Sequence, residues 1–203
     1  MPTNPADDII EFWIGPAATD PEESSARARL WYQSTPESDE DLRHRFGDLL
    51  NQAEQGELEH WRETANGTLA LVILMDQFSR NLYRGTAQAF SNDDHVAAVA
   101  EQAVDTGLDQ QMSWIGRAFL YHPFEHSERI DRQERSVELF SKLVEDAPGD
   151  WKKHLEGFAE YAAEHRNVVK QFGRFPHRNA VLGRESTPEE IAYLDSGARR
   201  YGQ

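Results

Sequence analysis

Residues 171–184, QFGRFPHRNAVLGR, combine three arginines and a histidine with no acidic residue. The acid-free segment extends back to residue 165, although the chain as a whole has 36 Asp and Glu against 21 Lys and Arg and a net charge of −15. Arginine binds carboxylates and phosphates through two parallel hydrogen bonds. The stretch therefore predicts either a site for an anionic group or an internal network in which these arginines neutralise the protein's own acids.

A second polar stretch, MDQFSRNLYRG at 75–85, follows the apolar run LALVILM at 69–75. Asp76, Arg80 and Arg84 are spaced by four residues, so they share one face of a helix. A charge that continues a buried helix has to be paired or has to face a cleft. One interpretation is an internal Asp76–Arg80 pair with Arg84 near the end of the helix. The other is that Arg80 or Arg84, beside Asn81, is presented to an anionic ligand.

The third stretch is YHPFEHSE at 121–128, in which His122, Glu125 and His126 match the inverted zinc-peptidase pattern H-x-x-E-H. That pattern needs both histidines on one unbroken helix, and Pro123 predicts that a helix ends there. No third ligand is evident in the sequence. We therefore predict no metal. His126 and Glu128 either orient each other or hold a neighbouring arginine, or they form an acid–base pair in a cleft.

Helices are expected to position these residues. Four starts combine a capping side chain, a proline and then acidic residues, an order that favours helix N-termini; they begin at Asn4, Asp20, Thr35 and Thr187. Apolar residues recur at helical spacing between these starts, and no segment alternates as a strand does. The sequence predicts a single all-α domain over residues 1–203, with about eight to ten helices packed as helical hairpins in a bundle or a stacked array.

Composition narrows the function classes. The chain has no cysteine, its N-terminus lacks the basic start of a signal peptide, and its longest apolar run is too short for a bilayer. The acid excess argues against nucleic acid and anionic membranes as partners. Nucleotide-binding, serine hydrolase and calcium-binding motifs are absent, so no cofactor is predicted. We expect a cytoplasmic protein, and the sequence gives no indication of its oligomeric state.

The three stretches together resemble a known family. The patterns DQFxRNxYRG, PFxHSE and FGRFPHRN, with LGRxST after them, are similar to an uncharacterised bacterial family, domain of unknown function 924. The opening IIEFWIG and the pair WY at 31–32 also fit. The resemblance implies an all-helical fold related to the tetratricopeptide superfamily, which often presents a concave surface for peptides. It implies no activity. His122 departs from the family pattern, where an apolar residue is usual.

Three hypotheses follow for the site. The favoured one is a cleft that binds a small anionic ligand or a peptide. The residues predicted to bind it are Asp76, Arg80, Asn81, Arg84, His126, Glu128, Arg174, His177, Arg178 and Asn179. The second is a small enzyme with His126, Glu128 and His177 as acid–base candidates. The third is a structural network that locks the helices in register.

Overall fold

The computed structural model describes residues 4–197 and is all-helical over that range, without a strand. Counting α4, the π-helical turn after it and α5 as one continuous helix gives nine helices, which confirms the predicted fold class. Their bounds are α1 Pro5–Trp13, α2 Pro21–Tyr32, α3 Pro36–Glu54, α4 Ala65–Val72, α5 Ser79–Leu82, α6 Asp93–Asp105, α7 Trp114–His126, α8 Ile130–Asp146, α9 Gly149–Phe172 and α10 Pro188–Asp195. Short 3-10 turns join several of them.

The four predicted helix starts are confirmed. Asn4, Asp20, Thr35 and Thr187 are the N-caps of α1, α2, α3 and α10, and each side chain accepts a hydrogen bond from a backbone N–H of the first turn. At Thr187 the Glu190 side chain also accepts from the backbone N–H of the cap, which completes a capping box. These bonds satisfy donors that have no partner within the helix.

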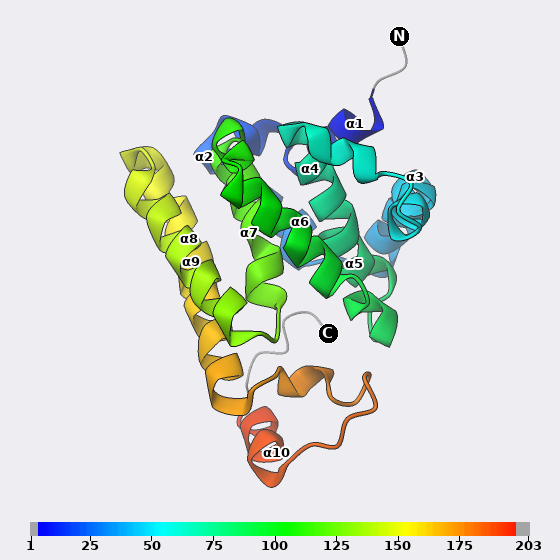
Figure 1. Cartoon of the computed structure of the whole chain (residues 1–203), viewed down its shortest axis with the longest axis vertical. Coiled ribbons are helices and arrows are strands. Elements are labelled where there is room, and N and C mark those ends of the chain that lie inside the picture. The colour runs from blue at the N-terminus through cyan, green and yellow to red at the C-terminus, as the bar shows by residue number, and fades with distance from the viewer. Residues whose placement is uncertain (1–3, 198–203) are drawn as a thin grey trace.

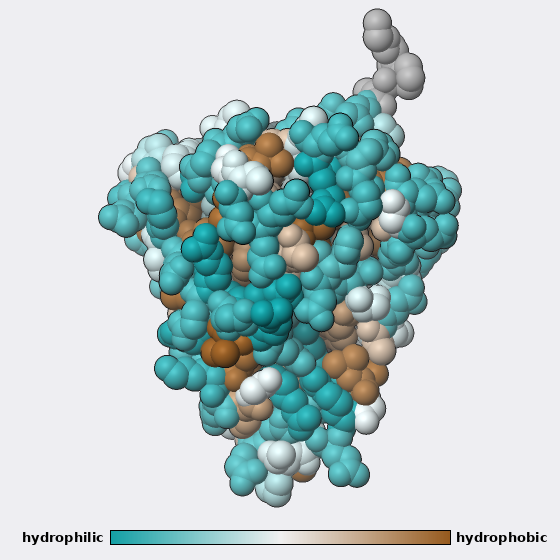
Figure 2. Space-filling model, viewed as in Figure 1, coloured by the Kyte–Doolittle hydropathy of each residue, from teal (hydrophilic) through white to brown (hydrophobic). Residues whose placement is uncertain are grey.

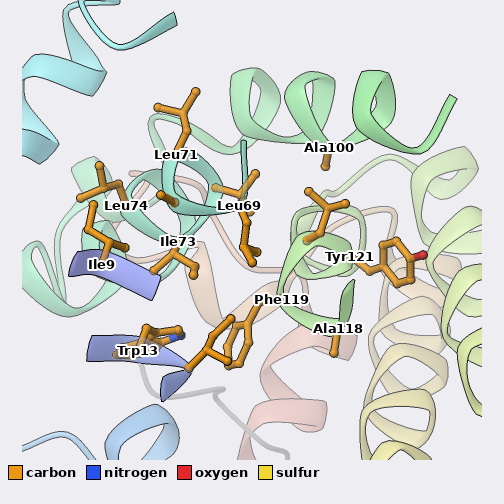
Figure 3. Close-up of a cluster of buried hydrophobic side chains, with 14 of the residues drawn as sticks. Ile9, Trp13, Leu69, Leu71, Ile73, Leu74, Ala100, Ala118, Phe119 and Tyr121 are labelled. Atoms are coloured by element: carbon orange, nitrogen blue, oxygen red, sulfur yellow. The ribbon is translucent and has the colours of Figure 1, made fainter. Parts of the chain in front are cut away.

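The central helix runs from Ala65 to Leu82, and its apolar run is deeply buried, as are residues 115–125 of α7. Figure 3 shows Ile73 and Leu74 of this helix beside Ile9 of α1, with Trp13 and Phe119 nearby. Residues Ile73–Phe78 form a π-helical turn. Such turns are rare and occur frequently at functional sites. Asp76 lies in this one and is fully buried.

Two long helices, α8 and α9, form an antiparallel pair along one side of the molecule (Figure 1). Helix α7 packs against both, and the N-terminal α2 also contacts α9. The chain then passes Gly173, whose φ of +71° is left-handed, and its last part (η6 at Pro176–Arg178 and α10) lies below the other helices in Figure 1. Neighbouring helices thus pack as hairpins, while the tetratricopeptide-like stacking stays a prediction.

Helix α7 corrects one prediction, because it continues through Pro123 to His126. A proline inside a helix removes one backbone donor. The end of α7 is secured from outside: the Gln133 side chain donates to the carbonyls of Glu125 and Ser127, both at 2.6 Å. Helix α7 therefore carries His122 and His126 one turn apart on one face, the arrangement that the sequence argued against.

Polar side chains cover most of the face in Figure 2, and the apolar residues form small separate patches there. Within the described part of the chain, no helix has the combination of length and apolar character that crossing a membrane requires.

Candidate functional site

A cavity of about 630 Å³ lies between α2, the π-turn with α5, the end of α7 and the middle of α9. One part of its lining is aromatic, with Trp31, Tyr32, Phe158 and Tyr161. The polar part is built from His122, Glu125, His126 and His165 together with Arg80, Asn81 and Arg84, and Lys153 and His154 complete the basic residues. The volume falls within the range of small-molecule sites, which combine apolar walls with a few convergent polar groups.

Asp76 and His126 form the innermost polar contact. The His126 Nδ1 lies 2.8 Å from Oδ1 and 3.0 Å from Oδ2 of Asp76. An ionised carboxylate only accepts hydrogen bonds, so Nδ1 carries the proton and donates a hydrogen bond to Asp76. Arg80 Nε, at 3.4 Å from Nδ1, is then a second donor facing the same nitrogen and makes no hydrogen bond with it. Burial would raise the pKa of Asp76, but His126 and Arg80 hold it well below its usual value.

Glu125 is the least satisfied charge in the cavity. Its side chain is only 5% exposed, and Oε2 is buried with no hydrogen-bond partner. Oε1 lies 3.7 Å from Nε2 of His126, beyond hydrogen-bond distance. Burial raises the pKa of Glu125 well above its usual value, and the negative charge of Asp76 adds to the shift. A buried carboxyl without a partner is a costly feature that structures rarely keep without a use.

Two further histidines line the cavity, and each has a backbone carbonyl as the partner of its Nδ1. His122 Nδ1 is 2.8 Å from the Ala118 carbonyl, and His165 Nδ1 is 2.8 Å from the Tyr161 carbonyl. Because a carbonyl only accepts, each ring is protonated at Nδ1 and its lone pair is at Nε2. Burial lowers the pKa of His122, and it lowers that of His165 to about 4. Both rings are therefore neutral at neutral pH.

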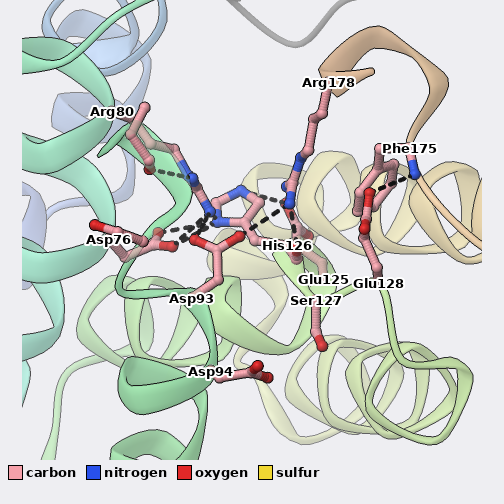
Figure 4. Close-up of polar contacts among 12 residues, drawn as sticks. Asp76, Arg80, Asp93, Asp94, Glu125, His126, Ser127, Glu128, Phe175 and Arg178 are labelled. Atoms are coloured by element: carbon pink, nitrogen blue, oxygen red, sulfur yellow. Dashed lines mark hydrogen bonds and ion pairs between the residues drawn. The ribbon is translucent and has the colours of Figure 1, made fainter. Parts of the chain in front are cut away.

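Distant segments of the chain converge beside the cavity (Figure 4). Arg80 Nη2 lies 3.1 Å from Asp76 and 2.9 Å from Oδ1 of Asp93, while Arg178 Nη1 lies 2.9 Å from Oδ2 of Asp93. Arg178 also donates to the His126 carbonyl at 2.9 Å and stacks on Phe175. The middle and the tail of the chain thus share one carboxylate, and Arg178 supports the end of α7 electrostatically.

The remaining predicted tail residues have internal partners. Arg174 binds both oxygens of Glu190 at 2.7 and 2.8 Å, and Arg184 binds both oxygens of Glu128 at 2.6 and 2.9 Å. The Asn179 side chain donates to Ser186 and Glu190. These contacts match the structural alternative raised from the sequence.

The structure therefore divides the predicted site residues. Arg80, Asn81, Arg84 and His126 line the cavity, and Asp76 lies directly behind His126. Glu128, Arg174, His177, Arg178 and Asn179 are outside its lining. Accordingly, the acid–base candidates His126, Glu128 and His177 do not share one cavity. Sequence reasoning missed Glu125 and His165 as site residues. The signal for His165 was present, because it falls on the apolar face of α9 that Phe158, Ala162 and Val169 define.

This geometry defines a class of protein: an all-helical protein with a polar, histidine-rich cavity at the junction of its helices. The model of a bacterial protein family of unknown function, DUF924, matches residues 9–198, and the chain belongs to that family. The structure is similar to that of a protein of unknown function, ATU0120, from Agrobacterium tumefaciens, with a TM-score of 0.80 and 38% identity over 95% of this chain and 97% of that one. No curated protein matches the chain.

Proposed function

We propose that the protein binds a small organic anion in the cavity between α2, α5, α7 and α9. Charge is the observation that carries the proposal. The cavity lining has three permanent cations, Arg80, Arg84 and Lys153, against two carboxylates, Glu22 and Glu125, in a chain whose net charge is −15. Cations exposed at the cavity attract anions from solution.

Arg84 and Lys153 supply the cationic groups for the ligand. Arg80 is held by Asp76 and Asp93 and is 13% exposed. Arg84 is 36% exposed, lies 3.6 Å from Asp39, and also donates hydrogen bonds to the neutral side chains of Ser34 and Asn81. A pair at that distance exchanges its partner for a ligand carboxylate or phosphate at low cost. Lys153 is exposed on α9 and lines the same cavity.

The shape of the cavity favours a compact ligand over a peptide. An extended peptide needs a groove, and about 630 Å³ holds a molecule of small-metabolite size. Trp31, Phe158 and Tyr161 supply apolar surface for its carbon skeleton. The proposal thus narrows the predicted anionic ligand to one that has both an anionic end and an apolar or planar body.

The test is a thermal-shift screen of small carboxylates and phosphates, each paired with its neutral amide or alcohol, followed by calorimetry of the hits. Wild-type protein should bind an anion and not its neutral partner. Arg84→Gln and Lys153→Gln should each weaken binding about tenfold, because a charge-assisted hydrogen bond contributes about 1.5–3 kcal/mol. The matched control is Arg45→Gln, which removes an exposed arginine that pairs with Asp41 on α3.

If the anion binds equally well to Arg84→Gln, Lys153→Gln and the double variant, the cavity is not its site and the proposal is wrong. Equal binding of the anion and its neutral amide would also overturn it, since charge recognition is its central claim.

A further inference from the structure

Three potential ligand atoms meet at the inner end of the cavity. One atom each from Glu125, His126 and His165 lies within 4.8 Å of the other two. Glu125 and His126 come from the end of α7, and His165 comes from α9, about 40 residues further along the chain. Two packed helices therefore fix the group, and none of its members depends on a loop.

The hydrogen bonds of both histidines direct their lone pairs in the manner of metal ligands. His126 donates Nδ1–H to the Asp76 carboxylate, and His165 donates Nδ1–H to the Tyr161 carbonyl. Histidines that bind metals almost always donate their other ring N–H to a carboxylate or a backbone carbonyl, which fixes the tautomer and the ring orientation. Both kinds of outer partner are present here, and both leave Nε2 as the ligating nitrogen.

The inner end of the cavity lacks a counter-charge for one of its carboxylates. Three carboxylates lie together at this end, those of Asp76, Asp93 and Glu125, and two guanidinium groups, Arg80 and Arg178, neutralise the first two. Within the described part of the chain no arginine or lysine forms an ion pair with Glu125, and its Oε2 has no hydrogen-bond partner although the residue is 96% buried. A cation bound beside Glu125 would supply a counter-charge for the carboxylate and a partner for Oε2.

We propose that Glu125, His126 and His165 bind one divalent transition-metal ion, with Asp76 and the Tyr161 carbonyl orienting the two imidazoles. Two imidazoles and one carboxylate suit Zn²⁺ and related first-row ions, and sites with three protein ligands keep a position open for water or a ligand. All three residues line the cavity, so the cavity gives access to the bound ion. The metal site itself does not depend on the proposed function. Only the further role of the ion, as a second anchor for the organic anion, rests on that proposal.

His122 is outside the ligand set, which separates this site from the H-x-x-E-H pattern. Its ring stacks on Phe119 with centroids 5.0 Å apart. In the zinc-peptidase pattern the two histidines of the motif bind the metal and the glutamate acts as the base. Here the glutamate is a ligand, and the second imidazole comes from α9.

The experiment uses full-length protein stripped with a chelator and titrated with Zn²⁺ at pH 7.5 by calorimetry, with Co²⁺ as a spectroscopic probe. One ion per chain should bind, and Co²⁺ should give the visible absorption of a nitrogen- and oxygen-ligated site. His165→Ala and Glu125→Gln should each weaken Zn²⁺ binding by more than about 100-fold, since loss of an outer-shell partner alone costs 10–100-fold. His154→Ala at the cavity rim and His95→Ala, which breaks an exposed pair with Glu59, are the matched controls and should bind as wild type.

Glu125→Gln provides a readout that does not depend on binding curves. Without metal this variant should melt at or above the wild-type temperature, because it removes a buried ionisable group whose Oε2 has no hydrogen-bond partner. It should also lose the rise in melting temperature that Zn²⁺ gives the wild type. Absence of binding in wild-type protein up to millimolar Zn²⁺, or unchanged affinity in both His165→Ala and Glu125→Gln, would overturn the site. Arg84→Gln should keep full Zn²⁺ affinity, so loss of anion binding alone would count only against the proposed function.

Discussion

Arg80 and Arg178 bind the two oxygens of a single carboxylate, that of Asp93, each at 2.9 Å. The two arginines are almost 100 residues apart in the sequence, and Asp93 is the first residue of α6. Arg178 and Asp93 are largely buried, with side-chain exposures of 6% and 15%. This shared carboxylate connects the central helix to the C-terminal segment and holds Arg80 beside Asp76, so it fixes the floor of the cavity.

Asp93→Asn should destabilise the fold by about 3 kcal/mol, because it leaves two buried guanidinium groups without their common counter-charge. Urea denaturation at pH 7 measures the loss. The control is the same substitution at the next residue, Asp94→Asn, whose side chain is 90% exposed and pairs with Arg132. That variant should lose less than about 1 kcal/mol. Similar losses in the two variants would show that the shared carboxylate contributes nothing beyond a surface pair.

Arg174→Ala should lower stability and leave anion binding in the cavity unchanged. The reason is that Arg174 makes charge-assisted bonds to both oxygens of Glu190, which is buried and also caps α10. Arg135→Ala removes an exposed arginine that pairs with Glu138 and should lose less than half as much. A stable Arg174→Ala variant with weakened anion binding would restore Arg174 to the ligand site, where the sequence first placed it.

The same pair gives a pH dependence. Hydrogen bonds from Arg174 lower the pKa of Glu190 to about 2, from 4.5 in an unfolded chain. Between these values the folded state binds fewer protons than the unfolded state, so the contribution of Glu190 to stability is complete above pH 4.5 and is lost as the pH falls toward 2. The stability difference between wild type and Arg174→Ala should therefore narrow over this window, as urea denaturation at pH 7, 4 and 3 would measure. A constant difference would mean that Glu190 is not held by Arg174.

His177 should contribute a separate acid sensitivity at higher pH. Burial and the charge of Arg178 lower its pKa to about 3, from 6.5 in an unfolded chain. Between pH 6.5 and 3 the unfolded state binds more protons, so stability falls as the pH is lowered through this range. His177→Asn should reduce the slope of unfolding free energy between pH 6 and 4 by up to about 1.4 kcal/mol per pH unit. His44→Asn, on the exposed face of α3, is the matched control. Equal slopes in all three proteins would place the His177 ring in solvent.

Local signals predicted most of the helical fold. Helix starts were readable because capping and proline placement depend on only four or five consecutive residues, as at Thr35 and Thr187. The prediction that a helix ends at Pro123 was wrong because it used a local rule, that helices end before proline. The last turn of α7 is instead fixed by distant residues, through hydrogen bonds from Gln133 and Arg178. The π-turn around Asp76 had no sequence signal at all.

The site was harder to predict because its charges are assigned by tertiary contacts. Arginines at 174, 178 and 184 carry the same composition signal whether they bind a ligand or an internal acid, and the structure gives them Glu190, Asp93 and Glu128. Conversely, Glu125 carried no signal beyond its place in a familiar motif. Its importance comes from what surrounds it, a buried oxygen without a partner beside two oriented histidines.

Gly157 allows the cavity to be filled without damage to the fold. It lies in the middle of α9 and lines the cavity, and a Cβ added there would meet no atom within 4 Å. Gly157→Ala should therefore raise stability by about 1 kcal/mol, the usual gain inside a helix. Gly157→Phe should project a ring into the cavity, keep wild-type helicity by circular dichroism, and weaken anion binding at least tenfold. The control is Gly173→Ala, which should destabilise because residues with a side chain rarely adopt its φ of +71°, yet should leave anion affinity unchanged. Full anion affinity in Gly157→Phe would place the ligand elsewhere on the molecule.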